Sequence, residues 1–549
     1  MSFLTEILDA LENSPGTPVM QEIHDGQITA HVSARAFLEY VARGRAFLSQ
    51  QGLDRGDRVA LLAHNGIRWA AMDLAIMAEG LVAVPLYARQ APAELVAIMQ
   101  DCQPRLICCG EGELRDAVRS GWEQAPTVCV FDDIFATQHG IEARPLLQDT
   151  DAVTLIYTSG TSGDSKGVIL TAGNVGHMLR CTSSRLELLM ERSPDQDRVF
   201  HYLPFCFAGS WVLLLTALTR GSLLTLNTDL TKIANDMRVV GPDYFLNVPA
   251  LLERMRKAVD EQLWKAGGFV QTIYAKAKGA WLHKLEGRMS FVDRIWLSLA
   301  NSAIFPTIRK KMIGRNLRAL ICGSAPLNLE TQQFFMMLGI PVLQVYGLTE
   351  TTAICTMDDP RQVTPGRVGP VIDGVEMLVG ENEEILVRGP NIFPGYWNRP
   401  EETAKVLTDG WFHTGDQGEV DSKGNWKIVG RLKNLIILGS GHNIAPEPIE
   451  EKILQQLAGA SQVVLTGNGK GYLSAIITGQ VSEETAQSAI DVVNLELPHY
   501  KQIRGFYLRP EPFTVDSGLL TANGKLRRDL ITSTLHREIE DMYRVRAAV

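Results

Sequence analysis

One short stretch combines the residue types needed to hold a polyphosphate. Residues 157–167 read Tyr-Thr-Ser-Gly-Thr-Ser-Gly-Asp-Ser-Lys-Gly and follow the apolar run 153–156, which has the composition of a strand. Glycines let the backbone approach an anion closely, the hydroxyl groups donate hydrogen bonds, and Lys166 adds a positive charge. A Walker A loop is excluded, because Ser165 rather than glycine precedes the lysine. The alternative interpretation is a plain surface loop.

Acidic residues elsewhere in the chain could serve such a loop. Glu350 ends an aromatic-Gly-x-Thr turn, and Mg²⁺ at a phosphate site is commonly held by one or two carboxylates. The carboxylate of Asp416 can accept hydrogen bonds from two hydroxyl groups at once, and Arg431 lies fifteen residues later. The alternatives are a solvated charge at Glu350 and a structural ion pair between Asp416 and Arg431, which is compatible with hydroxyl binding.

Together with further motifs in order, these residues resemble the adenylate-forming superfamily of acyl-CoA synthetases, adenylation domains and luciferases. The other motifs that carry the resemblance are Gly323-Ser324-Ala325-Pro326, Tyr346-Gly347-Leu348-Thr349-Glu350, Gly395–Pro400, Trp411–Asp416, Gly430–Asn434 and Asn523-Gly524-Lys525. The stretches 408–434 and 438–447 look most like long-chain fatty acyl-CoA synthetases. The resemblance implies that ATP, with Mg²⁺, activates a medium- or long-chain fatty acid as an acyl-adenylate. Coenzyme A then accepts the acyl group on its thiol.

The resemblance also implies which residues bind the nucleotide. Tyr346 would offer an aromatic face to adenine, opposite a wall of small residues. Lys525 would contact the substrate carboxylate and the α-phosphate, although Asn-Gly-Lys alone predicts a surface hairpin turn. The residues expected to bind ATP or AMP are Thr158, Ser159, Gly160, Thr161, Ser162, Gly163, Lys166, Gly323, Ser324, Ala325, Tyr346, Gly347, Thr349, Asp416, Ile428, Arg431 and Lys525. Among them, Lys525, Glu350 and Thr158 are the expected catalytic residues, and Glu350 and Thr158 the expected metal ligands.

Other positions concern the acid, the thiol and a domain rotation. The expected acid pocket consists of Phe207, Gly323, Val345, Gly347 and Leu348. Lys433 matches the family's hinge, although it also suits a plain surface lysine. After rotation, Gly439, Ser440 and Gly441 would line the thiol channel. Two positions depart from many relatives: Phe207 replaces a histidine, which predicts a more apolar pocket mouth, and Asn434 replaces an acidic residue.

The elements that must position these residues alternate between strand and helix. The strands predicted from short apolar runs are Arg58–Ala63, Val82–Pro85, Leu106–Cys109, Val153–Tyr157, Leu223–Leu226 and Leu317–Cys322. Amphipathic stretches such as 36–51 and 92–101 separate many of them, which predicts mainly parallel sheets covered by helices. Short β-like segments follow residue 370. We therefore expect an α/β protein with a large N-terminal domain, 1–432, a β-rich subdomain within it, and a small mobile C-terminal domain, 433–549.

The bulk properties exclude several classes of protein. The formal charge of −9 argues against general nucleic-acid binding. The eight cysteines include no CxxC pair, which favours reduced thiols in a cytoplasmic protein over a zinc site. The N-terminus lacks the features of a signal peptide, and the apolar runs are too short for a transmembrane helix. The run 212–226 predicts a buried helix followed by a strand.

One long helical segment has the opposite charge to the chain. Residues 250–315 contain thirteen basic and five acidic residues, a local charge of +8. Such a segment, which also carries aromatic residues, could rest on an anionic membrane surface or could simply present a solvated helical face.

Alternative functions stay open. The acceptor could be the thiol of an acyl-carrier protein, or the acid could be aromatic or terpenoid. A non-catalytic nucleotide-binding module is the alternative of another class. The sequence does not predict the oligomeric state.

Overall fold

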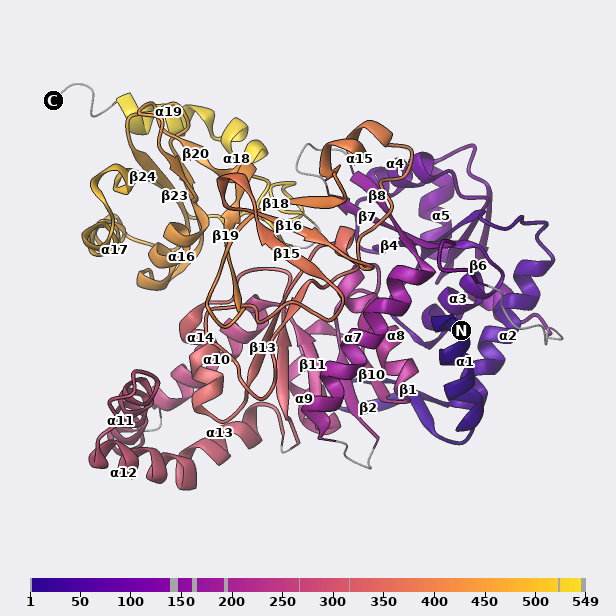
Figure 1. Ribbon diagram of the computed structural model, residues 1–549, viewed down its shortest axis with the longest axis horizontal. Helices are drawn as coiled ribbons and strands as arrows, with labels where there is room; N and C mark the ends of the chain where they lie inside the picture. Colours follow the sequence, from indigo (N-terminus) through magenta and orange to yellow (C-terminus); the bar gives the residue numbers. More distant parts are fainter. Residues whose placement is uncertain are drawn as a thin grey trace.

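In the computed structural model, residues 2–138, 147–159, 165–191, 196–265, 267–314, 316–521 and 524–544 are described, apart from the side chains of Ser159 and Trp264. Parallel strands dominate the larger part of the chain (Figure 1). One sheet has the order β14 (Thr356–Met357), β13 (Val342–Tyr346), β12 (Ala319–Cys322), β11 (Tyr244–Asn247), β9 (Arg198–His201), β10 (Leu223–Asn227), β1 (Pro18–His24) and β2 (Gln27–Ser33). The other has the order β6 (Thr127–Val130), β5 (Leu106–Cys109), β3 (Arg58–Leu62), β4 (Val82–Leu86), β7 (Ala152–Ser159) and β8 (Ser165–Thr171).

Helices cover these sheets, as the alternating pattern predicts (Figure 1). They are α1 (Phe3–Asn13), α2 (Ala34–Ser49), α3 (Ile67–Ala78), α4 (Pro92–Cys102), α5 (Gly112–Gly121), α6 (Phe131–Phe135), α7 (Ala172–Met190), α8 (Ala208–Thr219) and α9 (Ile233–Val240). The predicted strands and both predicted helices are confirmed to within two residues. The pairing of β1 with β2 is a hairpin that the prediction missed.

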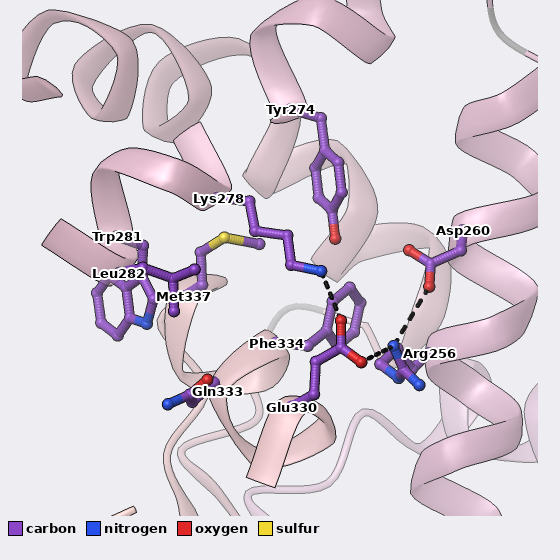
Figure 2. A pocket seen from close by; sticks show the side chains of 10 residues that line it. All are labelled: Arg256, Asp260, Tyr274, Lys278, Trp281, Leu282, Glu330, Gln333, Phe334 and Met337. Carbon is purple, nitrogen blue, oxygen red and sulfur yellow. Dashed lines mark hydrogen bonds and ion pairs between the residues drawn. The ribbon is translucent and has the colours of Figure 1, made fainter. Parts of the chain in front are cut away.

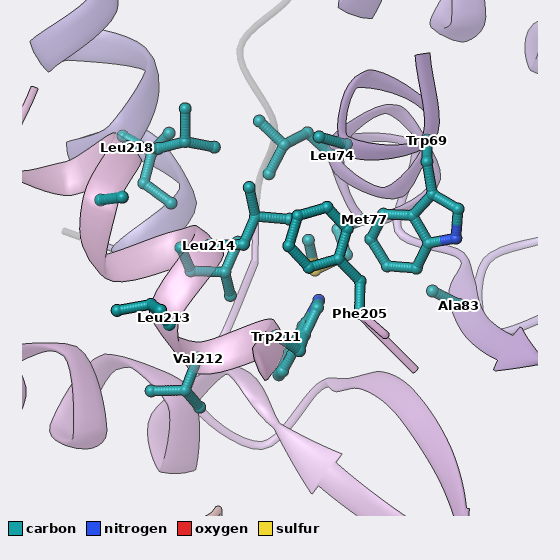
Figure 3. Packing of buried hydrophobic residues seen from close by; sticks show 14 of the residues in the cluster. Trp69, Leu74, Met77, Ala83, Phe205, Trp211, Val212, Leu213, Leu214 and Leu218 are labelled. Atoms are coloured by element: carbon teal, nitrogen blue, oxygen red, sulfur yellow. The ribbon is translucent and has the colours of Figure 1, made fainter. Parts of the chain in front are cut away.

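The centre of the main core lies where α3 meets α8 (Figure 3). Trp211 of α8 is fully buried, and its indole N–H donates a hydrogen bond of 2.7 Å to the carboxylate of Asp73. Burial raises the pKa of Asp73 to about 7, since the charged form loses its hydration. The prediction of a buried helix followed by a strand over 212–226 is therefore confirmed by α8 and β10.

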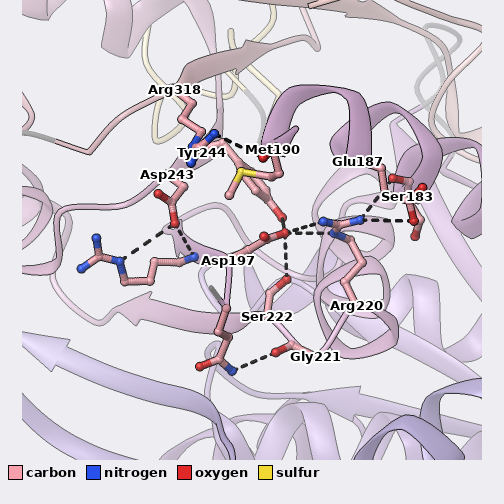
Figure 4. Close-up of polar contacts among 12 residues, drawn as sticks. Ser183, Glu187, Met190, Asp197, Arg220, Gly221, Ser222, Asp243, Tyr244 and Arg318 are labelled. Carbon is pink, nitrogen blue, oxygen red and sulfur yellow. Dashed lines mark hydrogen bonds and ion pairs between the residues drawn. The ribbon is translucent and has the colours of Figure 1, made fainter. Parts of the chain in front are cut away.

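A buried carboxylate ties the middle strands of the first sheet together (Figure 4). Asp197, which precedes β9, accepts a hydrogen bond of 2.7 Å from Arg220, which follows α8. The hydroxyl of Tyr244, at the start of β11, donates to the same oxygen at 3.1 Å. Since the arginine compensates the buried negative charge, this network fixes the amino ends of these strands.

A helical insertion projects from one corner of the first sheet (Figure 1). It consists of α10 (Pro249–Lys265), α11 (Gly268–Leu285), α12 (Phe291–Leu299), the π-helical turn η2 (Ala300–Ile304) and α13 (Phe305–Met312), and α14 (Leu329–Met337) packs beside it. Arg256 and Lys278 hold Glu330 of α14 at 3.1 and 2.6 Å (Figure 2). The pocket beside them has a volume of about 20 Å³, which is room for about one water molecule.

The remaining chain forms a β-rich part and a small C-terminal part. The β-rich sheet contains β15 (Glu376–Val379), β16 (Glu384–Arg388), β17 (Leu407–Thr408), β18 (Trp411–Val420) and β19 (Trp426–Arg431), with α15 (Pro400–Val406) beside it. The C-terminal part contains β20 (Ile436–Ile437), β21 (Asn443–Ile444), α16 (Glu447–Gln456), β22 (Ala460–Thr466), β23 (Leu473–Gly479), α17 (Glu483–Glu496), β24 (Ile503–Arg509), α18 (Arg528–Thr534) and α19 (His536–Arg544). Short 3-10 turns are η1 (Leu230–Lys232), η3 (Thr349–Thr351), η4 (Glu381–Glu383), η5 (Leu432–Asn434) and η6 (His499–Lys501). The expected α/β class, with a large N-terminal and a small C-terminal part, is confirmed.

None of the helices within the described ranges combines the length and the apolar composition needed to cross a bilayer.

Candidate active site

The two strands that flank the expected phosphate-binding residues pair in antiparallel fashion. Strands β7 and β8 pair so that Thr158 faces Lys166 and Ser159 faces Ser165. Gly160, Thr161, Ser162 and Gly163, which the sequence assigns to phosphate binding, lie outside the described residues. The pairing of β7 with β8 therefore places Thr158 and Lys166 side by side on adjacent strands.

Lys166 is held by two groups from the region around α15. Its ammonium forms an ion pair with Glu402 and lies 5.2 Å from the centre of the Tyr396 ring. A cation over an aromatic face is attracted by the ring quadrupole. Glu402 and Tyr396 therefore fix the position of the Lys166 ammonium.

The same tyrosine contacts Glu350. The hydroxyl of Tyr396 donates a hydrogen bond of 2.8 Å to the Glu350 carboxylate, which η3 places directly after β13. Burial, with the nearby charge of Glu350, raises the pKa of Tyr396, so the hydroxyl stays a donor at neutral pH. Tyr396 thus connects the groups expected to bind phosphate and metal. Sequence reasoning missed Tyr396 and Glu402, although Tyr396 belongs to a motif that carries the resemblance.

Close backbone packing explains two glycines in the other motifs. A Cβ atom on Gly347 would lie 2.2 Å from the carbonyl oxygen of Ala353, and one on Gly323 would lie 2.7 Å from the side chain of Val345. Neither distance is sterically possible without movement of the chain. The ends of β12 and β13 therefore approach their neighbours closely. In this region Gly323 is buried, Val345, Gly347, Leu348 and Thr349 are half-buried, and Ser324 and Ala325 are exposed.

Asp416 is the centre of a buried polar cluster. It lies opposite Arg431 on the paired strands β18 and β19, and the arginine Nε contacts its Oδ1 at 2.7 Å. The Tyr346 hydroxyl donates to Oδ2 at 2.8 Å. Asp416 is 4% exposed, and burial raises its pKa against the opposing effects of Arg431, Tyr346 and Lys525. Ile428 of β19 packs in the small apolar cluster that includes Tyr346.

The structure thus contains the ion pair that the sequence left as an alternative for Asp416. Both oxygens are engaged, but a carboxylate has about four acceptor positions, so each oxygen keeps capacity for one more donor. Hydroxyl binding remains chemically possible there. The ring of Tyr346 is buried, and its hydroxyl is held by Asp416 rather than turned to solvent.

Lys525 reaches this cluster from the C-terminal part. It lies in a tight turn in which the backbone amide of Thr521 donates to the Lys525 carbonyl at 2.8 Å. Its pKa is lowered, first by burial and then by Arg431, while Asp416 and Glu350 act in the opposite direction. Lys525 therefore lies within electrostatic range of Arg431, Asp416 and Glu350, and Asn523 of the predicted turn lies outside the described residues. Part of the Lys525 side chain stays accessible to solvent, although protein surrounds its ammonium on several sides.

An ion pair holds the turn of Lys525 against the large part of the chain. Arg527, two residues later, contacts Glu94 of α4 at 3.4 Å.

Lys433, in η5 between the two parts, is exposed, and its pKa is lowered by burial of its ammonium and by Arg431 and Lys166. It therefore lies near the positively charged side of the cluster.

The expected thiol-channel residues are elsewhere. Gly439, Ser440 and Gly441 form the exposed connection between β20 and β21. The Gly439 amide donates to the carbonyl of Lys470 at 2.8 Å, and the Ser440 hydroxyl lies 2.9 Å from His442. The partners of this loop are therefore Lys470 and His442 of the C-terminal part rather than Glu350 or Asp416 of the large part.

Phe207 caps the start of α8 and contacts another aromatic ring. Its ring centre lies 5.9 Å from that of Tyr87. His201, nearby in sequence, is fully buried and stacks on Phe205. Burial lowers the pKa of His201 to about 4, so it is neutral at physiological pH. His201 therefore does not replace the positive charge that could be carried by the histidine that many relatives have at the position of Phe207.

The residues present suit a magnesium–nucleotide complex rather than a structural metal site. Within the described ranges, no group of three or more His, Cys, Asp or Glu side chains is arranged to hold an ion. Mg²⁺ at a nucleotide needs fewer, because phosphate oxygens and water complete its octahedron. Glu350, oriented by Tyr396 and near Lys525, provides such a carboxylate.

Comparisons with known proteins find relatives that match most of the chain. A long-chain-fatty-acid–CoA ligase of Mycobacterium bovis is 27% identical over 576 residues, covering 97% of this chain and 95% of the relative. A chloroplastic long-chain-fatty-acid–[acyl-carrier-protein] ligase of Arabidopsis thaliana is 26% identical, covering 90% of this chain and 80% of the relative. The fold matches O-succinylbenzoate coenzyme A synthetase from Bacillus subtilis in complex with AMP, with a TM-score of 0.75 at 20% identity, over 95% of this chain and 97% of that one.

Two family descriptions divide the chain between them. Residues 433–547 match the AMP-binding enzyme C-terminal domain. Residues 9–397, most of the chain, match the AMP-binding enzyme domain itself, so the protein belongs to the AMP-binding enzyme family.

Proposed function

We propose that this protein is an AMP-forming acid–thiol ligase that makes an acyl-adenylate from ATP and a medium- or long-chain fatty acid, then transfers the acyl group to coenzyme A. The observation that carries the proposal is the convergence of Lys525 with Glu350, Asp416 and Arg431. These residues come from different parts of the chain, and their charges act on one another's pKa values. A site of mixed charge suits a reaction between two anions.

In the first half-reaction the acid carboxylate attacks the α-phosphorus of ATP, the bond to pyrophosphate breaks, and the acyl phosphate bond forms. Lys525 compensates the negative charge of both reactants as they approach, and Lys166 with the hydroxyl of Thr158 holds the departing phosphates. Mg²⁺, when bound through Glu350, with Thr158 as a further ligand, neutralises phosphate charge. Asp416 accepts a hydrogen bond from the ribose, and the adjacent Arg431 favours the charged form of that carboxylate against the effect of burial.

The nature of the acid rests on the relatives and on the apolar mouth of the pocket. The Mycobacterium bovis relative is named for long-chain fatty acids. At the proposed pocket, Phe207 and Tyr87 present aromatic rings, and Gly323, Val345, Gly347 and Leu348 line the ends of β12 and β13. An alkyl chain buries well against such a surface. The small pocket near Glu330 is far too small for an acyl chain.

In the second half-reaction the thiol must reach the adenylate from another side. We propose that residues 433–549 rotate as a domain against residues 1–432 about Lys433, which withdraws Lys525 and brings Gly439, Ser440 and Gly441 to the channel for coenzyme A. The acyl bond to sulfur then forms, AMP leaves, and the thiol proton passes to solvent. An acyl-carrier protein is the alternative acceptor, since the Arabidopsis relative is named for it.

A panel of acids tests the proposal. Acid-dependent exchange of pyrophosphate into ATP should appear with fatty acids, and coenzyme A should increase AMP release. Exchange that prefers aromatic or terpenoid acids would overturn the fatty-acid assignment. Stimulation by acyl-carrier protein but not by coenzyme A would overturn the acceptor. Tight ATP binding without exchange for any acid would indicate a binding module and overturn the enzymatic function.

A further inference from the structure

An apolar stripe on α12 faces solvent. Phe291, Val292, Ile295 and Leu299 are 76%, 57%, 45% and 45% exposed. At 100° per residue these positions fall within an arc of about 100° on the helix. Such a stripe normally faces a protein core, and here it faces outward. Figure 1 shows α12 at the outer end of the helical insertion, away from the sheets.

The other face of α12 already makes the contacts that hold the helix. Trp296 and Leu297 are half-buried and pack against the core of the insertion. The capping box between Ser290 and Asp293 fixes the start of the helix, and no residue of α12 is buried. The capping box and the two half-buried side chains hold the helix, while its apolar stripe is exposed.

Neighbouring apolar side chains extend the exposed surface. Leu282 and Leu285, at the end of α11, are also exposed, and α11 packs directly on α12. Phe269, at the start of α11, is 80% exposed. Soluble monomers rarely leave so many large apolar side chains together in water. The surface formed by the end of α11 and by α12, called the α11–α12 surface below, is therefore a candidate for docking.

Basic residues accompany this surface. Lys284, Arg288 and Arg294 are exposed on α11, the connection and α12, where Arg288 forms an ion pair with Glu286. The wider segment 250–315 carries +8 in a chain of −9. Apolar side chains bordered by lysine and arginine are the composition by which helices lie in the headgroup region of an anionic bilayer. The apolar groups enter the acyl boundary, and the cations meet lipid phosphates.

We propose that the α11–α12 surface docks the protein on an anionic lipid bilayer, with α12 lying parallel to the membrane plane. This role does not depend on the identity of the acid or on the acceptor thiol. A second copy of this chain is a poorer occupant, because pairing two copies of the 250–315 segment, each with a charge of +8, would bring like charges together. A lipid surface satisfies both the apolar stripe and the positive charge at once.

The insertion also connects this surface with the strands of the candidate active site. Helix α10 begins at Pro249, directly after β11, and β11 pairs with β12, which leads into Gly323. Docking through α12 would therefore place the bilayer at the outer end of an insertion whose first helix starts beside the proposed acid pocket. A membrane-partitioned acid would then be released near the enzyme that consumes it.

Vesicle co-sedimentation of the full-length protein tests the docking. We expect binding to vesicles of phosphatidylcholine with about 30% phosphatidylglycerol, weaker binding to phosphatidylcholine alone, and loss of affinity at 0.5 M salt. Phe291→Gln with Ile295→Gln should lower the partition coefficient by about tenfold or more, since these side chains supply the largest apolar contact. Arg294→Glu should reduce binding to the anionic vesicles and leave binding to pure phosphatidylcholine vesicles unchanged.

A matched control lies on α17 in the C-terminal part. Val492 and Leu495 are 44% and 88% exposed, so Val492→Gln with Leu495→Gln removes comparable apolar surface elsewhere. This variant should bind vesicles like the parent protein, and both variants should keep activity toward a short, water-soluble acid. Equal vesicle binding by all variants would overturn the proposal. A parent protein that forms dimers, which Phe291→Gln with Ile295→Gln dissociates, and that ignores vesicles would assign the surface to a second copy instead.

Discussion

Replacement of Tyr396 by phenylalanine tests whether this tyrosine orients the carboxylate of Glu350 for metal binding. The change removes the hydroxyl that lies 2.8 Å from Glu350 and keeps the ring that lies 5.2 Å from Lys166. A hydrogen bond to a charged group contributes about 1.5–3 kcal/mol. Each 1.36 kcal/mol corresponds to a factor of ten, so the expected loss in kcat/KM for adenylation is about 10- to 150-fold.

The assay is acid-dependent pyrophosphate exchange, titrated with Mg²⁺ at several ATP concentrations. Tyr396→Phe should raise the Mg²⁺ concentration needed for half-maximal exchange, because the unbound Glu350 carboxylate samples more orientations. Thioester formation from supplied acyl-adenylate should change by less than about twofold, since that step breaks no bond to pyrophosphate.

A second tyrosine provides the control for this variant. Tyr244→Phe also removes a buried hydrogen bond to a carboxylate, that of Asp197, but at the amino end of β11. It should lower the free energy of unfolding by about 1–3 kcal/mol without changing the Mg²⁺ dependence. If Tyr396→Phe has an unchanged Mg²⁺ requirement, or if both half-reactions fall equally, the positioning role of Tyr396 is wrong.

Other variants separate the remaining roles. Lys525→Ala should lower exchange by about a hundredfold or more and spare thioester formation from supplied acyl-adenylate; equal loss of both steps would contradict its assignment. Lys433→Pro should keep pyrophosphate exchange and slow thioester formation, because proline suits the φ angle of the 3-10 turn and hinders a change to another backbone conformation. Loss of exchange alone would contradict a hinge at Lys433. Glu402→Gln should lower the KM for ATP by about two- to fivefold, since Lys166 then has no competing carboxylate, and a higher KM would contradict this. Asp73→Asn should gain stability relative to the parent as pH rises from about 4 to 7 in urea titrations. Because the pKa of Asp73 is raised in the folded protein, its protonated carboxyl stabilises the parent below about pH 4, and this stabilisation is lost as the pH rises to about 7. Parallel curves of the free energy of unfolding against pH for the two proteins would refute this expectation.

The sequence predicts the elements of this protein better than their contacts. Short continuous apolar runs, separated by amphipathic stretches, identify β3, β4, β5 and β10, because a strand buried on both faces needs such a run. The hairpin β1–β2 is missed because its second strand is largely exposed, with a burial pattern that gives no apolar run. Periodicity reports burial, and an exposed edge strand carries little of it.

The same limit applies to the candidate site. Motif order identifies Lys166, Glu350 and Asp416, since each stands at the end of a recognisable turn or strand. It does not identify Glu402, because its role follows from where α15 packs against the hairpin β7–β8, and that is a long-range contact. Exposure of α12 is likewise invisible in the sequence, where Phe291 and Ile295 have the spacing of an ordinary core-facing helix.

The two faces of one small sheet support the proposed domain rotation. In β22 and β23, Val463 and Ile477 point to the core that contains Ile436, Leu438 and Ile444, which flank Gly439–Gly441. The alternate residues Val464 and Ile476 point to the other core, which contains Leu519 and is bordered by Leu520 and Leu526, the neighbours of Lys525. The thiol-channel loop and Lys525 are therefore fixed to opposite faces of the same sheet. Because the described structure has Lys525 near Glu350 and Asp416, no local loop movement brings Gly439–Gly441 to the same place. Under the proposed function, the two half-reactions therefore need the C-terminal part to turn as a unit, and we propose that this turn begins at Lys433 in η5.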